Sequence, residues 1–388
     1  NVTGVQTCAL PIYRSAGRPA VMFVMERLID IAAQECGFDR VELRRRNLLR
    51  KEQLPYANPF GMIYDNGDYH QVMEQVLQMG DWAGFEARRA EAKARGKLRG
   101  IGVANYVETT SGAPRERAEI LVKPNGRVEL IIGTQASGQG HETSFSMLVS
   151  DWLGVDFDAV DVRYGDTQFV VAGGGSHSGR SMRFASLVIR QASDDIIERG
   201  KEIAARLLES AVEDIRFVQG QFTIAGTDRS LDLFTIAGQA QSNNELPEDL
   251  RGPFKAISDK ITPGLAFPFG AQVCEIEIDP QTGEWQIISY VAIDDVGIAV
   301  NPLILHGQTH GGIAQGAGQA LMEQCAYEQT SGQMLSASFM DYAMPRASDF
   351  PAFITQLSET PANSHPLGVR PGGEGGTTPA LGVCMNAI

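Results

Sequence analysis

The sequence predicts an α+β protein, because long helical patterns alternate with antiparallel hairpins. Two segments carry alternating apolar residues on both sides of a turn: residues 118–132, around Pro124-Asn125-Gly126, and residues 273–291, around residues 279–283. Apolar residues recur at helical spacing from Val21 onward and again from Phe184 to Leu207. Glycine-rich loops separate several of these elements, which indicates that the loops contact a ligand.

Composition narrows the class of protein. A chain of 388 residues can hold two or more domains, and its formal charge of −14 argues against nucleic acid or an anionic membrane surface as a partner. No apolar stretch is long enough for a transmembrane helix. The five cysteines are scattered without a C-x-x-C pair, which excludes a local zinc ribbon or ferredoxin-type motif and fits a cytoplasmic protein.

The ends of the chain are read separately. Residues 1–12 resemble the in-frame translation of a sequencing adapter, so they are left out of the fold prediction. We expect native sequence to be missing before residue 13 and after Ile388. The charged helix at 86–97 predicts a domain boundary, with residues 13–97 and 98–388 in different domains.

The first elements are predicted from their end signals. Pro19 can open a helix that ends at Gly37, and Asp39 can cap a second helix that follows. The run Arg44-Arg45-Arg46 is predicted to be the solvated face of that second helix, with anion binding as the less favoured reading. Residues 100–107 then begin a strand.

Two glycine loops precede predicted helices. The loop at 133–143 follows a strand and enters a helix, an arrangement whose backbone N–H groups favour an anion such as phosphate. It matches neither a Walker A loop nor G-x-G-x-x-G, and His141-Glu142 lacks the second histidine of a zinc-binding H-E-x-x-H motif. The loop at 173–181 repeats the arrangement, with Ser181 as the candidate N-cap.

The last third continues this pattern. Residues 243–260 are polar and predict an irregular surface segment. The segment 307–318 enters a small-residue helix, where Gly312 and Gly316 can serve either close packing or ligand contact. Gln308 and Gln315 on the same segment favour recognition of a heterocycle or a phosphate.

The loop at 368–378 places one carboxylate, Glu374, among four glycines. Glycine lets the backbone approach a ligand closely, so the pattern predicts that Glu374 is presented to something bound there. A flexible surface turn with an incidental acid is the alternative.

These motifs occur in one order along the chain, and together they resemble the molybdenum-binding subunit of the xanthine dehydrogenase and aldehyde oxidase family. Within that family the similarity is greatest to the large subunit of the aerobic carbon monoxide dehydrogenase type. The resemblance extends from Tyr13 to Ile388 and depends on residues 13–18, 138–143, 173–181, 294–297, 307–316, 339–346 and 372–376.

The resemblance implies two mixed sheet-and-helix molybdopterin-binding domains, the first truncated at its N-terminus and the second at its C-terminus. The metal would be held by the dithiolene of molybdopterin cytosine dinucleotide, not by side chains. Glu374 matches the catalytic general base of the family. The implied cofactor-binding residues are Gln139, Gly140, His141, Thr143, Ser178, Gly179, Arg180, Ser181, Gln308, Gln315 and Gly373. The implied active-site loop is Tyr13, Arg14, Ser15, Ala16, Gly17 and Arg18.

The resemblance also implies partners and a reaction. Iron–sulfur clusters and FAD would be carried by separate small and medium subunits, in a dimer of heterotrimers. Ser15 stands where carbon monoxide dehydrogenases have a copper-binding cysteine, and a hydroxyl is a weak ligand for Cu(I). We therefore expect a molybdenum hydroxylase acting on an aldehyde or N-heterocycle. The alternatives are a carbon monoxide dehydrogenase proper and a non-catalytic cofactor-binding fragment, and the isolated fragment is expected to be inactive.

Overall fold

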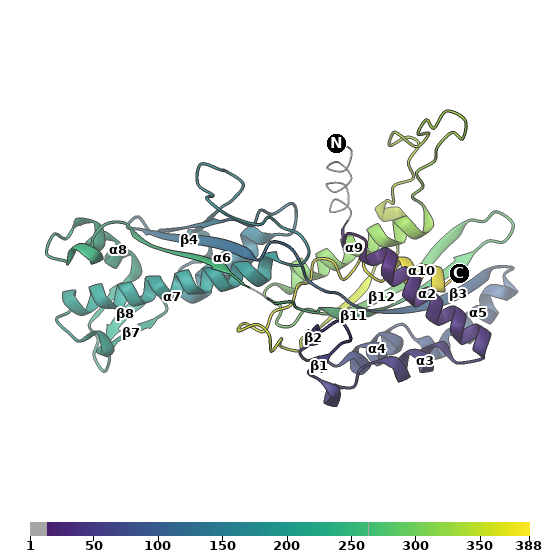
Figure 1. The fold of residues 1–388 in the computed structure, drawn as a ribbon, viewed down its shortest axis with the longest axis horizontal. Helices are drawn as coiled ribbons and strands as arrows, with labels where there is room; N and C mark the ends of the chain where they lie inside the picture. Colours follow the sequence, from purple (N-terminus) through teal and green to yellow (C-terminus); the bar gives the residue numbers. More distant parts are fainter. Residues whose placement is uncertain (1–13, 263) are drawn as a thin grey trace. The chain divides into compact units, whose positions relative to one another are not determined.

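The computed structural model describes residues 14–262 and 264–388, so the adapter-like residues 1–12 and Tyr13, which is predicted to belong to the active-site loop, lie outside the described residues. The chain divides into two compact units (Figure 1). The first unit joins the residues up to Thr110 to Leu265–Ile388, and the second is Ser111–Gly264. This division does not coincide with position 97, and the assignment of residues 13–97 and 98–388 to separate domains stays a prediction.

The first unit is built on a four-stranded sheet. Its strands lie in the order β13 (Ile354–Ser358), β12 (Trp285–Asp295), β11 (Phe269–Ile278) and β3 (Leu98–Val107). Neighbours are antiparallel except β12 and β13, which are parallel. In the register of the sheet, Phe269 lies opposite Val107 on one side and Asp295 on the other. The residues that follow β3 and the last residues of β12 therefore lie at the same end of the sheet.

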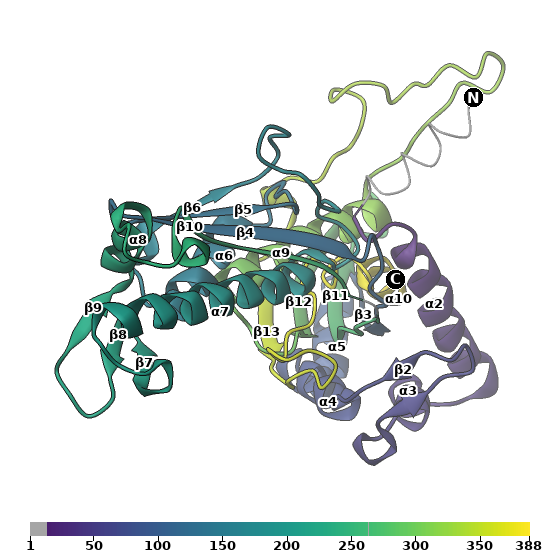
Figure 2. The ribbon, with the colours of Figure 1, turned by 60° about the vertical axis from the view of Figure 1, so that its left-hand side comes forward.

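Helices cover both faces of this sheet, as Figure 2 shows. One face packs α4 (Tyr69–Met79) and α5 (Phe85–Ala94) against residues such as Val103 and Val273. The other face packs α9 (Pro302–Leu321) and α10 (Ala380–Asn386). Glycine is needed on β3 beneath α10, because a Cβ at Gly100 would lie 1.9 Å from the carbonyl oxygen of Ala387.

Helix α2 (Arg18–Cys36) also packs on α10. Its C-cap is Gly37 with φ 68°, as predicted. The face that it buries differs from the apolar face that the sequence indicated. Val21, Val24, Met25 and Leu28 are each more than half exposed, whereas Glu26 and Asp30 are buried.

The buried acids of α2 explain the one wrong prediction in α3 (Arg40–Asn47). Asp39 caps α3 as expected, accepting the backbone N–H groups of residues 41 and 42. Arg44, however, is not part of a solvated face. It is 2% exposed and pairs with Glu26 at 2.7 Å and Asp30 at 2.6 Å. The charge of Arg44 is compensated by α2, which the sequence of α3 alone could not indicate.

The second unit contains a four-stranded sheet in the order β10 (Phe254–Ile261), β4 (Arg115–Lys123), β5 (Arg127–Ile132) and β6 (Val160–Arg163). The predicted hairpin of β4 and β5 is confirmed. Helices α6 (His141–Leu153) and α7 (Ser181–Leu207) pack against the sheet, alongside β4 in Figure 1. The expectation of an irregular segment at 243–260 is wrong for its end, because β10 pairs with residues 115–122 of β4. An edge strand with one solvated face reads as polar, which hid β10 in the sequence.

Smaller elements complete the two units. The remaining strands and helix are β1 (Tyr56–Ala57), β2 (Ile63–Tyr64), β7 (Ile215–Val218), β8 (Gln221–Ile224), β9 (Ser230–Asp232) and α8 (Leu233–Ser242). The 3₁₀ turns are Lys51–Gln53, Trp82–Gly84, Phe157–Ala159, Val212–Asp214, Glu248–Leu250 and Ala347–Asp349. Among residues 14–262 and 264–388, none of the helices combines the length and the apolarity that crossing a bilayer requires.

Candidate active site

The loop that carries Glu374 meets the loop at residues 14–18 within the first unit. Arg14 Nε donates to the carbonyl oxygen of Gly373 at 2.6 Å, across 359 positions of sequence. Ser15 Oγ and Thr378 Oγ1 are hydrogen-bonded at 2.8 Å. Arg18 Nη1 lies 3.2 Å from Glu374 Oε2. Three of the predicted active-site residues therefore hold one predicted loop in place.

The segment 15–17 has an unusual backbone. Ser15, Ala16 and Gly17 have φ angles of 67°, 35° and 86°, so three consecutive residues are left-handed and two of them carry a Cβ. Such conformations cost of order 1–3 kcal/mol each and cluster at functional sites. Ser15 is 1% exposed, and its bond to Thr378 helps to hold the strained turn.

The glycine loop is packed tightly beneath Glu374. A Cβ at Gly375 would lie 2.1 Å from Tyr106 Oη, and one at Gly376 would lie 2.3 Å from the carbonyl oxygen of Thr309. Residues 375–378 are buried. The alternative reading of a flexible surface turn is therefore wrong, because these glycines permit close packing of the loop on β3 and α9.

Helix α9 supplies the facing surface. A Cβ at Gly312 would lie 2.8 Å from the backbone nitrogen of Thr377, and one at Gly316 would lie 2.5 Å from Ala380 Cβ. Close packing is thus the role of both glycines. Arg14 Nη2 donates hydrogen bonds to two oxygens of Gln308: the backbone carbonyl oxygen, at 2.7 Å, and the side-chain oxygen, at 3.2 Å. Gln315 is half-buried two turns further along α9, about 10 Å away along the helix axis.

Asp294 lies beneath the loop and was not among the predicted site residues. It accepts hydrogen bonds from Tyr106 Oη and Thr309 Oγ1, both at 2.7 Å. Burial raises the pKa of Asp294, and these two bonds oppose that rise. Asp294 is the last but one residue of β12, so the polar end of an apolar strand was the available sequence signal.

The chain that enters the loop is held by Arg370. Its guanidinium pairs with Asp295 at 2.7 Å, and both side chains are fully buried. Arg370 also donates to the carbonyl oxygens of Thr360, at 2.7 Å, and Asn66, at 3.1 Å. These bonds fix the backbone four residues before Glu374.

A second carboxylate, Glu108, lies beside Glu374 and was missed in the sequence. Its Oε1 is 3.7 Å from Arg18 Nη1, the same atom that contacts Glu374. Glu108 is 2% exposed, and the Glu374 side chain is 15% exposed. Burial, and then contact with Glu374, raises the pKa of Glu108 well above its usual range. Its signal was a charged residue directly after the predicted strand 100–107.

The two glycine loops of the second unit contact each other. Thr134 Oγ1 donates to the carbonyl oxygen of Gly175 at 2.9 Å and is bonded to Ser181 Oγ at 2.8 Å. A Cβ at Gly133 would lie 2.3 Å from Gly173 Cα, so the backbones touch. The predicted cofactor-binding residues within 139–143 and 178–181 therefore lie on two loops that contact and support each other.

Arg180 braces the second of these loops from inside the fold. It is fully buried and donates to the carbonyl oxygens of Ala113, at 2.9 Å, and Arg115, at 2.8 Å, and it pairs with Glu116 at 2.8 Å. Helix α7 begins at Ser181, so the prediction of Ser181 as N-cap is wrong by one position. Before it, Ser178 and Gly179 are left-handed, with φ angles of 50° and 69°.

Helix α6 begins at His141 without a side-chain cap, after Gly140 with φ 69°. His141 stacks on Phe145 at 4.9 Å between ring centroids and is 7% exposed. Burial lowers the pKa of His141 to about 4, so its ring is neutral near pH 7. Gln139 folds back to accept the N–H of Ser137, and Thr143 is exposed.

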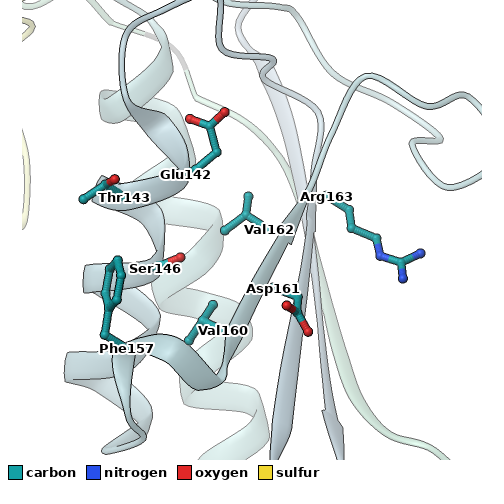
Figure 3. Close-up of a pocket in the computed structure, with 8 residues that line it drawn as sticks. All are labelled: Glu142, Thr143, Ser146, Phe157, Val160, Asp161, Val162 and Arg163. Carbon is teal, nitrogen blue, oxygen red and sulfur yellow. The ribbon is translucent and has the colours of Figure 1, made fainter.

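An open pocket of about 590 Å³ lies between α6 and β6 (Figure 3). It is lined by Glu142, Thr143, Ser146, Phe157, Val160, Asp161, Val162 and Arg163. Only Thr143 among the predicted cofactor residues lines this pocket, and Arg163 points away from α6.

Each unit also keeps buried polar atoms without protein partners. Within the described residues, Thr377 Oγ1 in the first unit and His141 Nδ1 in the second have no hydrogen-bond partner. Buried polar atoms are normally satisfied, so unmatched atoms in glycine-rich loops fit the binding of a polar, extended ligand.

Comparisons with known proteins agree with the binding of a polar, extended ligand. A family model described as a molybdopterin cofactor-binding domain matches residues 75–351, and a second with the same description matches residues 5–48. The carbon monoxide dehydrogenase large chain of Hydrogenophaga pseudoflava is 32% identical over 389 residues, covering 95% of this chain and 48% of the relative.

Two crystal structures superpose with a TM-score of 0.88. A Cu,Mo-CO dehydrogenase is 29% identical, covering 96% of this chain and 49% of the other. Quinoline 2-oxidoreductase from Pseudomonas putida 86 is 31% identical, covering 97% and 49%. The chain thus spans about half the length of these three relatives, of which two are named as carbon monoxide dehydrogenases and one as an oxidoreductase.

The predicted α+β class and the predicted resemblance are both confirmed. The roles of the individual site residues stay predictions. The family model that matches residues 75–351 covers more than half of the chain. The chain therefore belongs to the molybdopterin cofactor-binding family, together with the large, molybdenum-binding subunits of the xanthine dehydrogenase and carbon monoxide dehydrogenase type.

Proposed function

We propose that this chain is the cofactor-binding catalytic subunit of a molybdenum hydroxylase that oxidises an aldehyde or an N-heterocycle with water-derived oxygen. Glu374 is its general base. The observation that carries this proposal is the setting of Glu374: its carboxylate is partly exposed, while its loop is locked by Arg14, Ser15 and Arg18. A base must reach the proton that it takes and must be held in position to take it.

The cofactor we propose is molybdopterin cytosine dinucleotide. The residues proposed to bind it are Gln139, Gly140, His141, Thr143 and residues 178–181 of the second unit, and Gln308, Gln315 and Gly373 of the first. When bound, this group supplies a metal that activates the water-derived oxygen and accepts two electrons. The uncapped start of α6 offers N–H groups to an anionic ligand, and neutral His141 adds no charge there.

Within the chain, Glu374 accepts a proton at its carboxylate. Its own carbonyl oxygen accepts the N–H groups of Thr377, at 3.1 Å, and Thr378, at 3.2 Å, so the side chain extends from a backbone turn held by two hydrogen bonds. Arg18 Nη1 lies 3.2 Å from Glu374 Oε2 and helps to hold the carboxylate in place.

Ser15 bears on the choice of substrate. Carbon monoxide oxidation is a second candidate, because two of the relatives carry that activity in their names and one is named as a copper enzyme. The Ser15 hydroxyl is a hard ligand, poorly suited to Cu(I), and it is engaged with Thr378. We therefore favour an organic substrate. A non-catalytic fragment is the least favoured reading, since a scaffold needs no carboxylate at position 374.

The proposal includes an iron–sulfur small subunit, an FAD-binding medium subunit and assembly as a cytoplasmic dimer of heterotrimers. The support is that the first relative is named as a large chain and that this sequence contains no C-x-x-C pair. Electrons would leave the site through these partners.

The test of the base is Glu374→Gln in the full-length protein, expressed with its neighbouring subunits. Molybdenum content should be unchanged, while turnover falls by at least the 10² to 10⁴-fold typical of a general base. Glu359→Gln, an exposed acid near the same region, is the matched control and should leave turnover unchanged. Normal activity of Glu374→Gln would refute the assignment.

The substrate class is tested by metal analysis of the same preparation. Molybdenum without copper, and bleaching of the chromophores by an aldehyde or azaheterocycle, is the expected result. Copper at the same stoichiometry as molybdenum, with bleaching by carbon monoxide, would replace the hydroxylase proposal with the carbon monoxide dehydrogenase reading.

A further inference from the structure

We propose that Glu108 is a positioning residue that shares a single proton with Glu374, donating it as a hydrogen bond to the carboxylate of the base. This inference deepens the proposed function and rests on Glu374 being the base. It assigns a role to a residue that none of the sequence motifs includes.

The carboxyl groups of Glu108 and Glu374 both lie near the same guanidinium nitrogen. Arg18 Nη1 lies 3.2 Å from Glu374 Oε2 and 3.7 Å from Glu108 Oε1. Glu374 also acts directly on Glu108, and after burial it is the largest cause that raises the pKa of Glu108. A hydrogen bond between two carboxyl groups needs a proton on one of them, because two ionised carboxylates can only accept.

The surroundings decide how many charges the pair can hold. The charged and titratable groups that act on Glu108 are Glu374, Arg18, Asp294, Tyr106 and Arg14. Two of these are further acids, and Tyr106 already donates to Asp294. The second terminal nitrogen of Arg18 is engaged elsewhere, because Nη2 donates to the carbonyl oxygen of Thr109 at 2.8 Å. Arg14 donates to the carbonyl oxygens of Gly373, at 2.6 Å, and Gln308, at 2.7 Å, so Arg18 is the guanidinium that lies against both acids. One such guanidinium does not compensate two adjacent ionised acids in a buried setting, so one acid stays protonated.

Burial identifies which acid keeps the proton. Glu108 is 2% exposed, and its Oε1 accepts no hydrogen bond from any described residue, whereas the Glu374 side chain is 15% exposed. Charge is costlier on the more buried group. The pKa of Glu108 is accordingly raised, by burial first and by Glu374 second.

The backbone holds Glu108 rigidly for this role. Its N–H donates to the carbonyl oxygen of Pro268 at 2.9 Å, and the N–H of Thr110 donates to that of Ala266 at 3.1 Å. These bonds continue the pairing beyond the end of β3. A neutral acid held here stabilises ionised Glu374 without adding a second negative charge, so the base stays available at lower pH.

The experiment compares Glu108→Gln and Glu108→Ala in the full-length protein with its partner subunits. Glutamine resembles the neutral acid in shape and can donate, so the acid limb of the kcat/KM profile should stay within a few tenths of a pH unit. Alanine removes the donor and should move that limb upward by about one unit. A purely structural role would lower activity in both variants without moving the limb, and that result would overturn the proposal.

A second readout does not depend on turnover. The carbonyl stretch of a protonated carboxylic acid should appear in the infrared spectrum near pH 7, should disappear in Glu108→Gln and should persist in the Glu359→Gln control. Absence of this band in the parent protein would overturn the proposal. Failure of the proposed function is recognised separately, because it would leave Glu374→Gln active whatever the infrared result.

Discussion

Removing the Arg370 side chain should destabilise the first unit strongly, because Arg370→Met leaves the buried carboxyl group of Asp295 without its cation. The two side chains are fully buried and 2.7 Å apart. Breaking a buried ion pair from one side costs about 3–5 kcal/mol. The carbonyl oxygens of Thr360 and Asn66 also lose a donor, which adds about 1 kcal/mol or more. The total is a large part of an ordinary folding free energy of about 5–15 kcal/mol.

The assay is urea unfolding followed by circular dichroism, with Arg370→Met compared with the double variant Arg370→Met/Asp295→Asn. The double variant removes the stranded charge and keeps the side-chain oxygen that accepts the N–H of Gly297 at 3.1 Å. It should therefore recover about 1–3 kcal/mol of the loss. A single variant that costs less than about 1 kcal/mol, or a double variant no more stable than the single, would refute the reasoning.

Two further predictions concern stability. The folded-state pKa of His141 is about 4 against 6.5 when unfolded, so the unfolded chain binds more protons between these values and stability is lost as pH falls through them. The free energy of unfolding should fall between pH 7 and pH 4, and this fall should be about 3 kcal/mol larger in the parent protein than in His141→Gln. An equal fall in both proteins would contradict the prediction. Gly375→Ala should lower stability by about 1–3 kcal/mol through contact with Tyr106, with Tyr106→Phe partly compensating. Gly307→Ala, on open helix surface, is its control and should not destabilise.

Local signals predicted the elements well. The Asn-Gly turn of β4 and β5, the cap at Asp39 and the left-handed Gly37 are set by residues a few positions apart, and all three are confirmed. Where a segment depends on a distant partner, the prediction was wrong. Strand β10 became visible only through its pairing with β4, and Arg44 only through the acids of α2.

The candidate site divides in the same way. Order and spacing of motifs were enough to single out Glu374 and the loop before α2, and to predict a family that the comparisons confirm. They did not include Glu108, which stands in no motif. Asp294 lies in the motif at 294–297, but the sequence did not indicate a role for it. Both reach the site through sheet register, in which Phe269 pairs with Val107 and with Asp295.

The sequence by itself determined the local conformations of turns, caps and helix ends. Those properties depend on steric limits and hydrogen bonds between near neighbours in the chain. Only the tertiary structure decided the charge environment of the base. The contact of Glu108 with Glu374 across one arginine joins segments from opposite ends of the chain. The ionisation of such groups depends on burial and on opposing charges, which exist only once the sheet and helices have packed.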